Sequence, residues 1–214
     1  MRVEIWSDVV CPWCYLGQAR FRKALASFPH EAEVQVEHRS FELDPGFPAD
    51  QVVPVTDMLR SKYGLSPAQA DAAEQRIAGL AAAQGLPFHP DRLHGSTLGA
   101  HRLLKLAAAR GRQQEVIDAL YLAQFGGGRS IFDPASLAAI GADAGLDEDE
   151  AAQVLAGDAF TKEVRADEQR ARELGVTGVP FFLADGKLAV AGAQETATFG
   201  RLLGKAWDDA VPAR

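Results

Sequence analysis

The stretch Cys11-Pro12-Trp13-Cys14-Tyr15-Leu16-Gly17 decides the fold, and it carries the only two cysteines of the chain. A strand-like run, Val3–Trp6, precedes it, and the spacing of apolar residues predicts a helix over residues 11–28. Cys11 therefore falls at a helix start, where unpaired backbone N–H groups and a partial positive charge favour a thiolate. A thiol one turn further on can attack the mixed disulfide that the thiolate forms. We expect Cys11 to attack a substrate disulfide and Cys14 to resolve the mixed disulfide that results.

The first forty residues are predicted to form a β-α-β unit. Pro29 stops the first helix, and Val34–His38 alternates between apolar and polar residues as a strand does. The cysteines then lie at the first strand–helix junction, a position that bears ligands and catalytic groups in α/β sheets.

The remainder of the chain has two parts. Residues 56–157 are rich in Ala and Leu and are predicted to be almost entirely helical, with helix starts at Ser66, Asp133 and Asp147. A long helix follows from Asp158, and strands return on both sides of an Asp185-Gly186 hairpin turn before a final helix. The pattern indicates an α/β protein whose outer segments share one mixed sheet and whose inner helices form an insertion.

Composition limits the function classes. The chain has 214 residues, 47% of them hydrophobic, and a formal net charge of −7. An acidic chain is unsuited to general binding of nucleic acid or of an anionic membrane surface. Met1-Arg2 leads directly into a strand interrupted by Glu4 and Asp8, so we expect no signal peptide and a cytoplasmic location. There the thiol pair would be held mostly reduced.

Two other roles for the cysteine pair are weighed. A CxxC pair can supply half of a zinc site, but zinc normally takes four ligands, and the five histidines show no tight ligand spacing. A structural disulfide closing so short a loop would constrain the unfolded chain little. Redox chemistry without a metal is the preferred interpretation.

A second signal is Gly175-Val176-Thr177-Gly178-Val179-Pro180-Phe181, where a proline opens a predicted strand. Together with the CxxC stretch, it resembles the thioredoxin superfamily, and within it the DsbA-like group with an inserted helical domain. Residues 7–17 are most similar to the FrnE branch of that group. Further matching stretches are Phe41–Pro45, Ala100–Leu103, Gly178–Phe182 and Val190–Gln194.

The resemblance implies a thioredoxin fold with a large all-helical insertion domain, with residues 1–43 and 158–214 forming the thioredoxin-fold domain and 44–157 the inserted domain. It also implies a cis peptide bond between Val179 and Pro180, packed against the thiol pair. The backbone of Val179 would pair with an extended substrate segment.

The implied activity is protein dithiol–disulfide exchange, as oxidase, reductase or isomerase. The partners would be proteins that contain disulfides or thiols. No cofactor is needed beyond the cysteine pair, with glutathione possible as reductant or co-substrate. Pro12 and Trp13 belong to the motif and would shape the groove beside the thiols.

The chain departs from the family at the proton acceptor of the second cysteine. Many thioredoxin relatives carry a buried acid six residues before the first cysteine, and that position here is Ile5. The nearest carboxylates are Asp8 and Glu4, and strand alternation can point Glu4 away from the thiols. Asp8 is the candidate acceptor.

A neighbouring branch provides the alternative function. Glutathione-dependent 2-hydroxychromene-2-carboxylate isomerases and kappa-class glutathione transferases resemble this fold but typically have Ser at the position of Cys11. In that function Ser96, Thr97 and His101 could line a site for a small aromatic molecule, although a helix N-cap and a partly buried helix histidine are the preferred explanation of these residues. A non-enzymatic helical interaction module is a third class, but it leaves the thiol motif unused.

Overall fold

The structure, a computed structural model, describes residues 1–210 and divides into two units. Unit 1 comprises Met1–Leu43 and the chain from Arg165 onward, and unit 2 is Asp44–Val164. Unit 2 thus ends at Val164, and not at residue 157 as the sequence predicts. The helix that follows also begins later than predicted, at Thr161 instead of Asp158, because Phe160 takes a left-handed conformation with φ of 65°.

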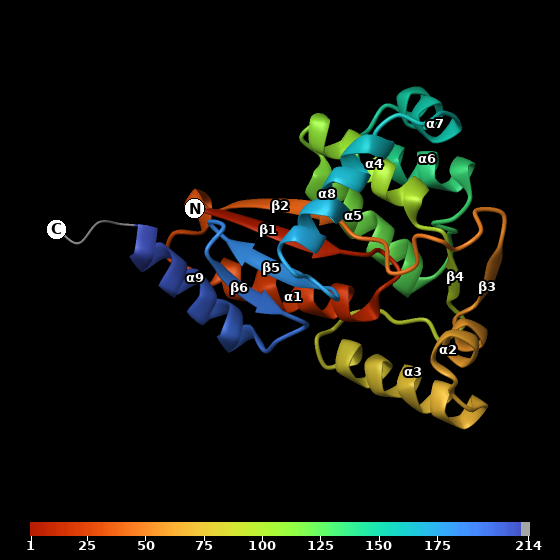
Figure 1. The fold of residues 1–214 in the computed structure, drawn as a ribbon, viewed down its shortest axis with the longest axis horizontal. Helices are drawn as coiled ribbons and strands as arrows, with labels where there is room; N and C mark the ends of the chain where they lie inside the picture. The colour runs from red at the N-terminus through yellow and green to blue at the C-terminus, as the bar shows by residue number, and fades with distance from the viewer. Residues whose placement is uncertain (211–214) are drawn as a thin grey trace. The chain divides into compact units, whose positions relative to one another are not determined.

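Unit 1 is built on a four-stranded mixed sheet of order β2-β1-β5-β6 (Figure 1). The central strand β1 pairs in parallel with β2 and antiparallel with β5, which pairs antiparallel with β6. Asp185 and Gly186 join β5 to β6 with φ of 46° and 68°, the left-handed pair that a tight hairpin requires. The strands are β1 (Arg2–Ser7), β2 (Gln35–Ser40), β5 (Phe181–Ala184) and β6 (Leu188–Ala191).

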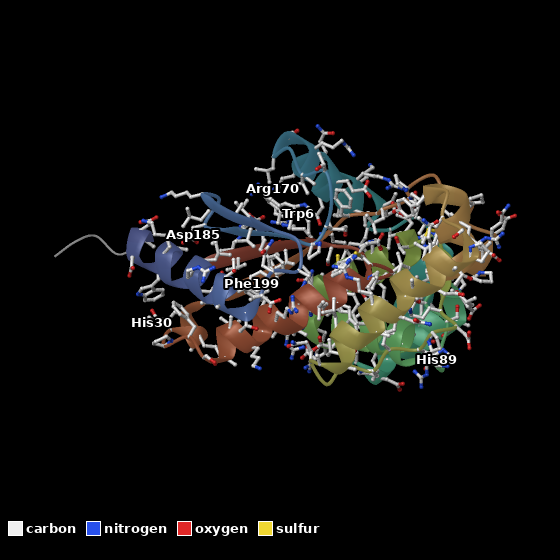
Figure 2. The ribbon with its side chains drawn as sticks, turned by 90° about the horizontal axis from the view of Figure 1, so that it is seen from below. Trp6, His30, His89, Arg170, Asp185 and Phe199 are labelled. Atoms are coloured by element: carbon white, nitrogen blue, oxygen red, sulfur yellow. The ribbon has the colours of Figure 1, made fainter. Side chains whose placement is uncertain are left out.

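Helices cover both faces of this sheet. In Figure 1, α1 (Pro12–Ala26) and α9 (Thr196–Ala210) lie on one side of the strands and α8 (Thr161–Glu173) on the other. Figure 2 shows Trp6 and Arg170 on the α8 side and Phe199 on the opposite side. This arrangement follows from strand alternation in β1, which sends Ile5 towards α1 and α9 and Trp6 towards α8.

Two apolar clusters hold these layers together. On the α1–α9 side Phe182 is fully buried, and its ring centroid lies 5.3 Å from that of Phe21 and 4.5 Å from that of Phe199. On the α8 side Trp6 packs with Ala171, Val176 and Leu183, and its indole N–H donates to the Asp167 carbonyl at 3.0 Å. The burial of the indole is therefore compensated by a hydrogen bond.

Unit 2 is mainly helical but not all-helical. Strands β3 (Val52–Pro54) and β4 (Leu93–Gly95) pair antiparallel in a small sheet that the sequence did not predict. Three residues are too few to show an alternating pattern. A π-helix, Leu122–Gly126, was also not predicted. The α-helices are α2 (Val55–Tyr63), α3 (Pro67–Ala82), α4 (Leu98–Ala109), α5 (Gln113–Tyr121), α6 (Pro134–Asp143) and α7 (Glu148–Ala156).

The predicted helix starts in unit 2 are confirmed by hydrogen bonds. The Ser66 hydroxyl accepts from the Gln69 N–H while the Gln69 side chain accepts from the Ser66 N–H, which completes a capping box. Asp133 caps α6, and Asp147 caps α7. Among the helices within residues 1–210, none is both long enough and apolar enough to cross a membrane.

Candidate active site

Cys11 is the N-cap residue of α1. Its backbone is extended, with φ of −82° and ψ of 113°, and its carbonyl accepts from the N–H groups of Cys14 at 3.0 Å and Tyr15 at 3.2 Å. Pro12 follows at the first helical position, where its missing N–H would have no helical partner. Cys11 thus lies at the positive end of the α1 dipole, and both cysteines are buried free thiols.

The second cysteine lies one turn further on and is almost completely shielded. Cys14 exposes 1% of its surface. Burial raises the pKa of the Cys14 thiol well above its ordinary value, and the neighbouring Cys11 and the charge of Asp8 act in the same direction. A backbone hydrogen bond at Asp8 opposes this shift without reversing it. Cys14 is therefore held as a protonated thiol at neutral pH.

The loop before β5 lies against Cys11. The Val179–Pro180 peptide bond is cis, and the Cys11 thiol donates to the Val179 carbonyl oxygen with a sulfur–oxygen distance of 3.8 Å. Trp13 is exposed by 37%, and Val179 is half-buried. The structure brings together five of the residues that the sequence analysis singled out: Cys11, Pro12, Trp13, Val179 and Pro180.

Asp8 is hydrogen-bonded to the backbone of Cys11. Its carbonyl accepts from the Cys11 N–H at 3.1 Å, and one carboxylate oxygen accepts from the Leu43 N–H at 2.7 Å. Asp8 is 1% exposed, and its charge acts on Cys14. The role of Asp8 as proton acceptor for Cys14 stays a prediction.

Glu4 is directed away from the thiols, towards α8. It shares that face with Trp6, whereas Ile5 lies in the opposite apolar cluster. The Glu4 carboxylate accepts from Arg2 at 2.6 Å, Arg39 at 3.0 Å and Arg170 at 2.8 Å. Burial alone would raise the pKa of Glu4, but these hydrogen bonds and the positive charges lower it overall.

Sequence reasoning missed this ion-pair layer. Asp167 extends it, because its carboxylate accepts from Arg39 at 3.2 Å and from the Ser40 N–H at 2.7 Å. One sequence signal was present: both β1 and β2 carry two charged residues spaced two positions apart, which places each pair on one strand face. In the structure Glu4 lies opposite Glu37. Two carboxylates at opposed positions require cations nearby.

The three residues of the alternative small-molecule site lie in unit 2. Thr97 is the N-cap residue of α4, although its side chain makes no capping bond, and the His101 N–H donates to the Thr97 carbonyl at 3.0 Å. Thr97 and His101 are buried, and Ser96 is partly so. Two cavities of unit 2, of about 360 Å³ and 200 Å³, are lined by other residues. The small-molecule site stays a prediction.

Within residues 1–210, no group of three or more His, Cys, Asp or Glu side chains is arranged to hold a metal ion.

A thiol pair at the first strand–helix junction, with a proline loop beside it and helices on both faces of the sheet, defines the thioredoxin class of fold. A sequence profile of the DSBA-like thioredoxin domain matches residues 2–204. The chain therefore belongs to the DSBA-like thioredoxin family.

Known proteins agree with this assignment. A probable DsbA oxidoreductase from Streptomyces coelicolor is 51% identical with a TM-score of 0.95, covering 100% of this chain and 93% of that one. YwbO of Bacillus subtilis, an uncharacterized protein, is 39% identical over 57 residues, and the match covers 27% of this chain and 26% of YwbO. The chain thus spans about a quarter of that relative.

Two more distant structures share the fold. The cytosolic disulfide reductase DsbM from Pseudomonas aeruginosa, also solved with GSH, is 20% identical with a TM-score of 0.65, covering 98% of this chain and all of DsbM (100%). A 2-hydroxychromene-2-carboxylate isomerase is 17% identical with a TM-score of 0.72, covering 99% of this chain and 100% of the isomerase. At these identities the likeness concerns the fold alone.

Proposed function

We propose that this protein catalyses dithiol–disulfide exchange with protein substrates. The observation that carries the proposal is the Cys11–Cys14 pair at the start of α1, with the Val179 carbonyl beside the Cys11 sulfur. A helix start stabilises a thiolate at its N-cap, while burial keeps the Cys14 thiol protonated. The two sulfurs of one short motif therefore receive different roles.

The reductive half-cycle proceeds in two exchanges. The Cys11 thiolate attacks one sulfur of a substrate disulfide, forms a mixed disulfide and releases the other substrate sulfur as a thiolate. The Cys14 thiol then loses its proton, for which Asp8 is the proposed acceptor, and attacks the Cys11 sulfur. A Cys11–Cys14 disulfide forms, the second substrate sulfur leaves, and two electrons have passed to the substrate. The reverse sequence oxidises a substrate dithiol.

The substrate class is proposed from the loop beside the thiols. Val179 is half-buried and precedes β5, so its backbone is placed to pair with an extended segment of a protein substrate. The exposed side chain of Trp13, two residues after Cys11, offers apolar contact to the substrate. Glutathione is the proposed small-molecule partner that would restore the reduced pair.

A second candidate function is a glutathione-dependent isomerisation or transfer on a small aromatic molecule. The fold shared with 2-hydroxychromene-2-carboxylate isomerase supports it. The presence of two thiols favours exchange chemistry, because a single activated group is enough to bind glutathione for isomerisation.

Serine variants of the two cysteines test the proposal. Cys14→Ser should attack a disulfide-bonded peptide and stop at the mixed disulfide, which intact-mass spectrometry detects, and turnover should fall at least about a hundredfold. Cys11→Ser should form no adduct under the same conditions. Persistent glutathione-dependent isomerisation by Cys14→Ser, without any disulfide turnover by the wild type, would favour the second candidate.

A further inference from the structure

We infer that Gly17 and Arg20 are positioning residues that hold the Val179–Pro180 loop against Cys11. The inference rests on the proposed function and extends it to the recognition of extended substrates. Both residues lie on α1, one turn and two turns after Cys14, on the side of the helix that meets the loops flanking β5 and β6.

Position 17 requires glycine because Pro180 and Ala193 approach α1 closely there. A Cβ atom at this position would lie 2.9 Å from Pro180 Cγ and 3.3 Å from the Ala193 Cα. Glycine is unfavourable inside a helix, so the helix alone does not explain its presence. The missing side chain lets the ring of Pro180 and the backbone of Ala193 rest directly on α1.

Arg20, on the next turn of α1, holds the loop that follows β6. Its side chain is 8% exposed, and its Nη1 donates to the Ala193 carbonyl oxygen at 2.9 Å. Nη2 pairs with Glu195 at 3.0 Å, but Glu195 is 75% exposed, so water weakens that ion pair. The bond to the backbone of Ala193 is therefore the principal anchor.

These contacts close a ring that includes the active site. The Gly192 N–H donates to the Pro180 carbonyl at 2.7 Å, which joins the anchored residue Ala193 to Pro180 through its chain neighbour. Pro180 follows Val179 in the chain, and the Val179 carbonyl accepts a hydrogen bond from the Cys11 thiol. Cys11 begins the same helix that carries Gly17 and Arg20. The position of Val179 relative to Cys11 is thus set from α1.

A methyl group at position 17 has a defined consequence. Ordinary contacts begin at 3.4 Å, so Pro180 and α1 must separate by about 0.5 Å from the 2.9 Å approach to reach one. Such a shift displaces the Val179 backbone from the place where an extended peptide would pair. Misplacement by about 1 Å can cost about a hundredfold in rate, so about tenfold is expected here. A small disulfide that makes no such pairing should react nearly as before.

The test compares two disulfide substrates on the whole chain. Gly17→Ala and Arg20→Met are assayed with a disulfide-bonded peptide and with 5,5′-dithiobis(2-nitrobenzoate). The kcat/KM for the peptide should fall about tenfold, mainly through KM, while the value for the small disulfide stays within about threefold. Arg20→Lys should recover part of the loss because its ammonium can still donate to Ala193. Gly79→Ala is the matched control, since a Cβ there meets open space within α3.

The outcomes separate this inference from the proposed function. If the wild type turns over neither disulfide, the proposed function fails and the positioning role fails with it. If the wild type turns over both, and the variants lose nothing or lose equally on both substrates, the positioning role alone is overturned. If Gly17→Ala does not fold by circular dichroism, Arg20→Met with its Arg20→Lys rescue decides the question.

Discussion

Replacing Glu4 with Gln should weaken the sheet and change how stability depends on pH. The Glu4 carboxylate is buried beneath α8 and accepts hydrogen bonds from Arg2, Arg39 and Arg170. The pKa of Glu4 is lowered by these partners in spite of its burial. The amide side chain keeps the shape and one acceptor oxygen but loses the charge.

The size of the loss follows from the exposure of the three cations. Arg39 is 18% exposed, so its charge-assisted bond to Glu4 is worth about 2 kcal/mol. Arg2 and Arg170 are 46% and 45% exposed, so each pair contributes less than about 0.5 kcal/mol. Glu4→Gln should therefore lower the free energy of unfolding by about 2–3 kcal/mol near pH 7.

The pH dependence has a definite sign. Because the folded pKa of Glu4 lies below its ordinary value of 4.5, the stabilisation is complete above that value and is lost as the pH falls towards the folded pKa. Urea unfolding of wild type and Glu4→Gln from about pH 7 down to about pH 3 should show the difference shrinking in acid. Glu37→Gln, at a 37% exposed partner of Arg39, should cost below about 1 kcal/mol. A Glu4→Gln deficit under about 0.5 kcal/mol at pH 7, or one unchanged in acid, would refute the reasoning.

Three further changes test other parts of the structure. Phe182→Ala empties the space between Phe21 and Phe199 and should cost about 3–5 kcal/mol in urea unfolding, and a loss below about 1 kcal/mol would contradict the packing. Asp8→Asn removes a charge that raises the pKa of Cys14, so the pH midpoint for alkylation of Cys14 should fall, and an upward shift would exclude the electrostatic role. Asp133→Ala removes the cap of α6 and should cost about 1 kcal/mol, and an unchanged melting temperature would contradict that contribution.

Local chemistry explains what could be predicted from the sequence. The Ser66 capping box and the Asp185-Gly186 hairpin depend on residues within a few positions of each other. The placement of Cys11 at a helix start likewise needs only the preceding strand and the helical spacing that follows. Local structures of this kind form in the folded protein as the sequence predicts, because tertiary contacts rarely oppose them.

Long-range contacts explain what could not be predicted. Glu4 accepts a hydrogen bond from Arg170, which is 166 residues away in the chain, and no local sequence pattern predicts that pairing. Gly17 belongs to the quoted motif, yet only the fold shows that Pro180 occupies the space of its missing side chain. The later start of α8 depends on the left-handed backbone of Phe160, which the residue type does not favour.

The central claim is that the two buried thiols differ in reactivity because Cys11 begins α1, whereas Cys14 lies a turn deeper with its pKa raised. The most direct measurement is the site of iodoacetamide labelling in the reduced wild-type protein near pH 7, mapped by peptide mass spectrometry. With its pKa raised above the ordinary 9.0, the Cys14 thiol is ionised in fewer than about one molecule in a hundred at that pH. The prediction is early modification of Cys11, with Cys14 unlabelled until the pH is raised. Equal labelling of the two cysteines, or labelling of Cys14 first, would contradict it.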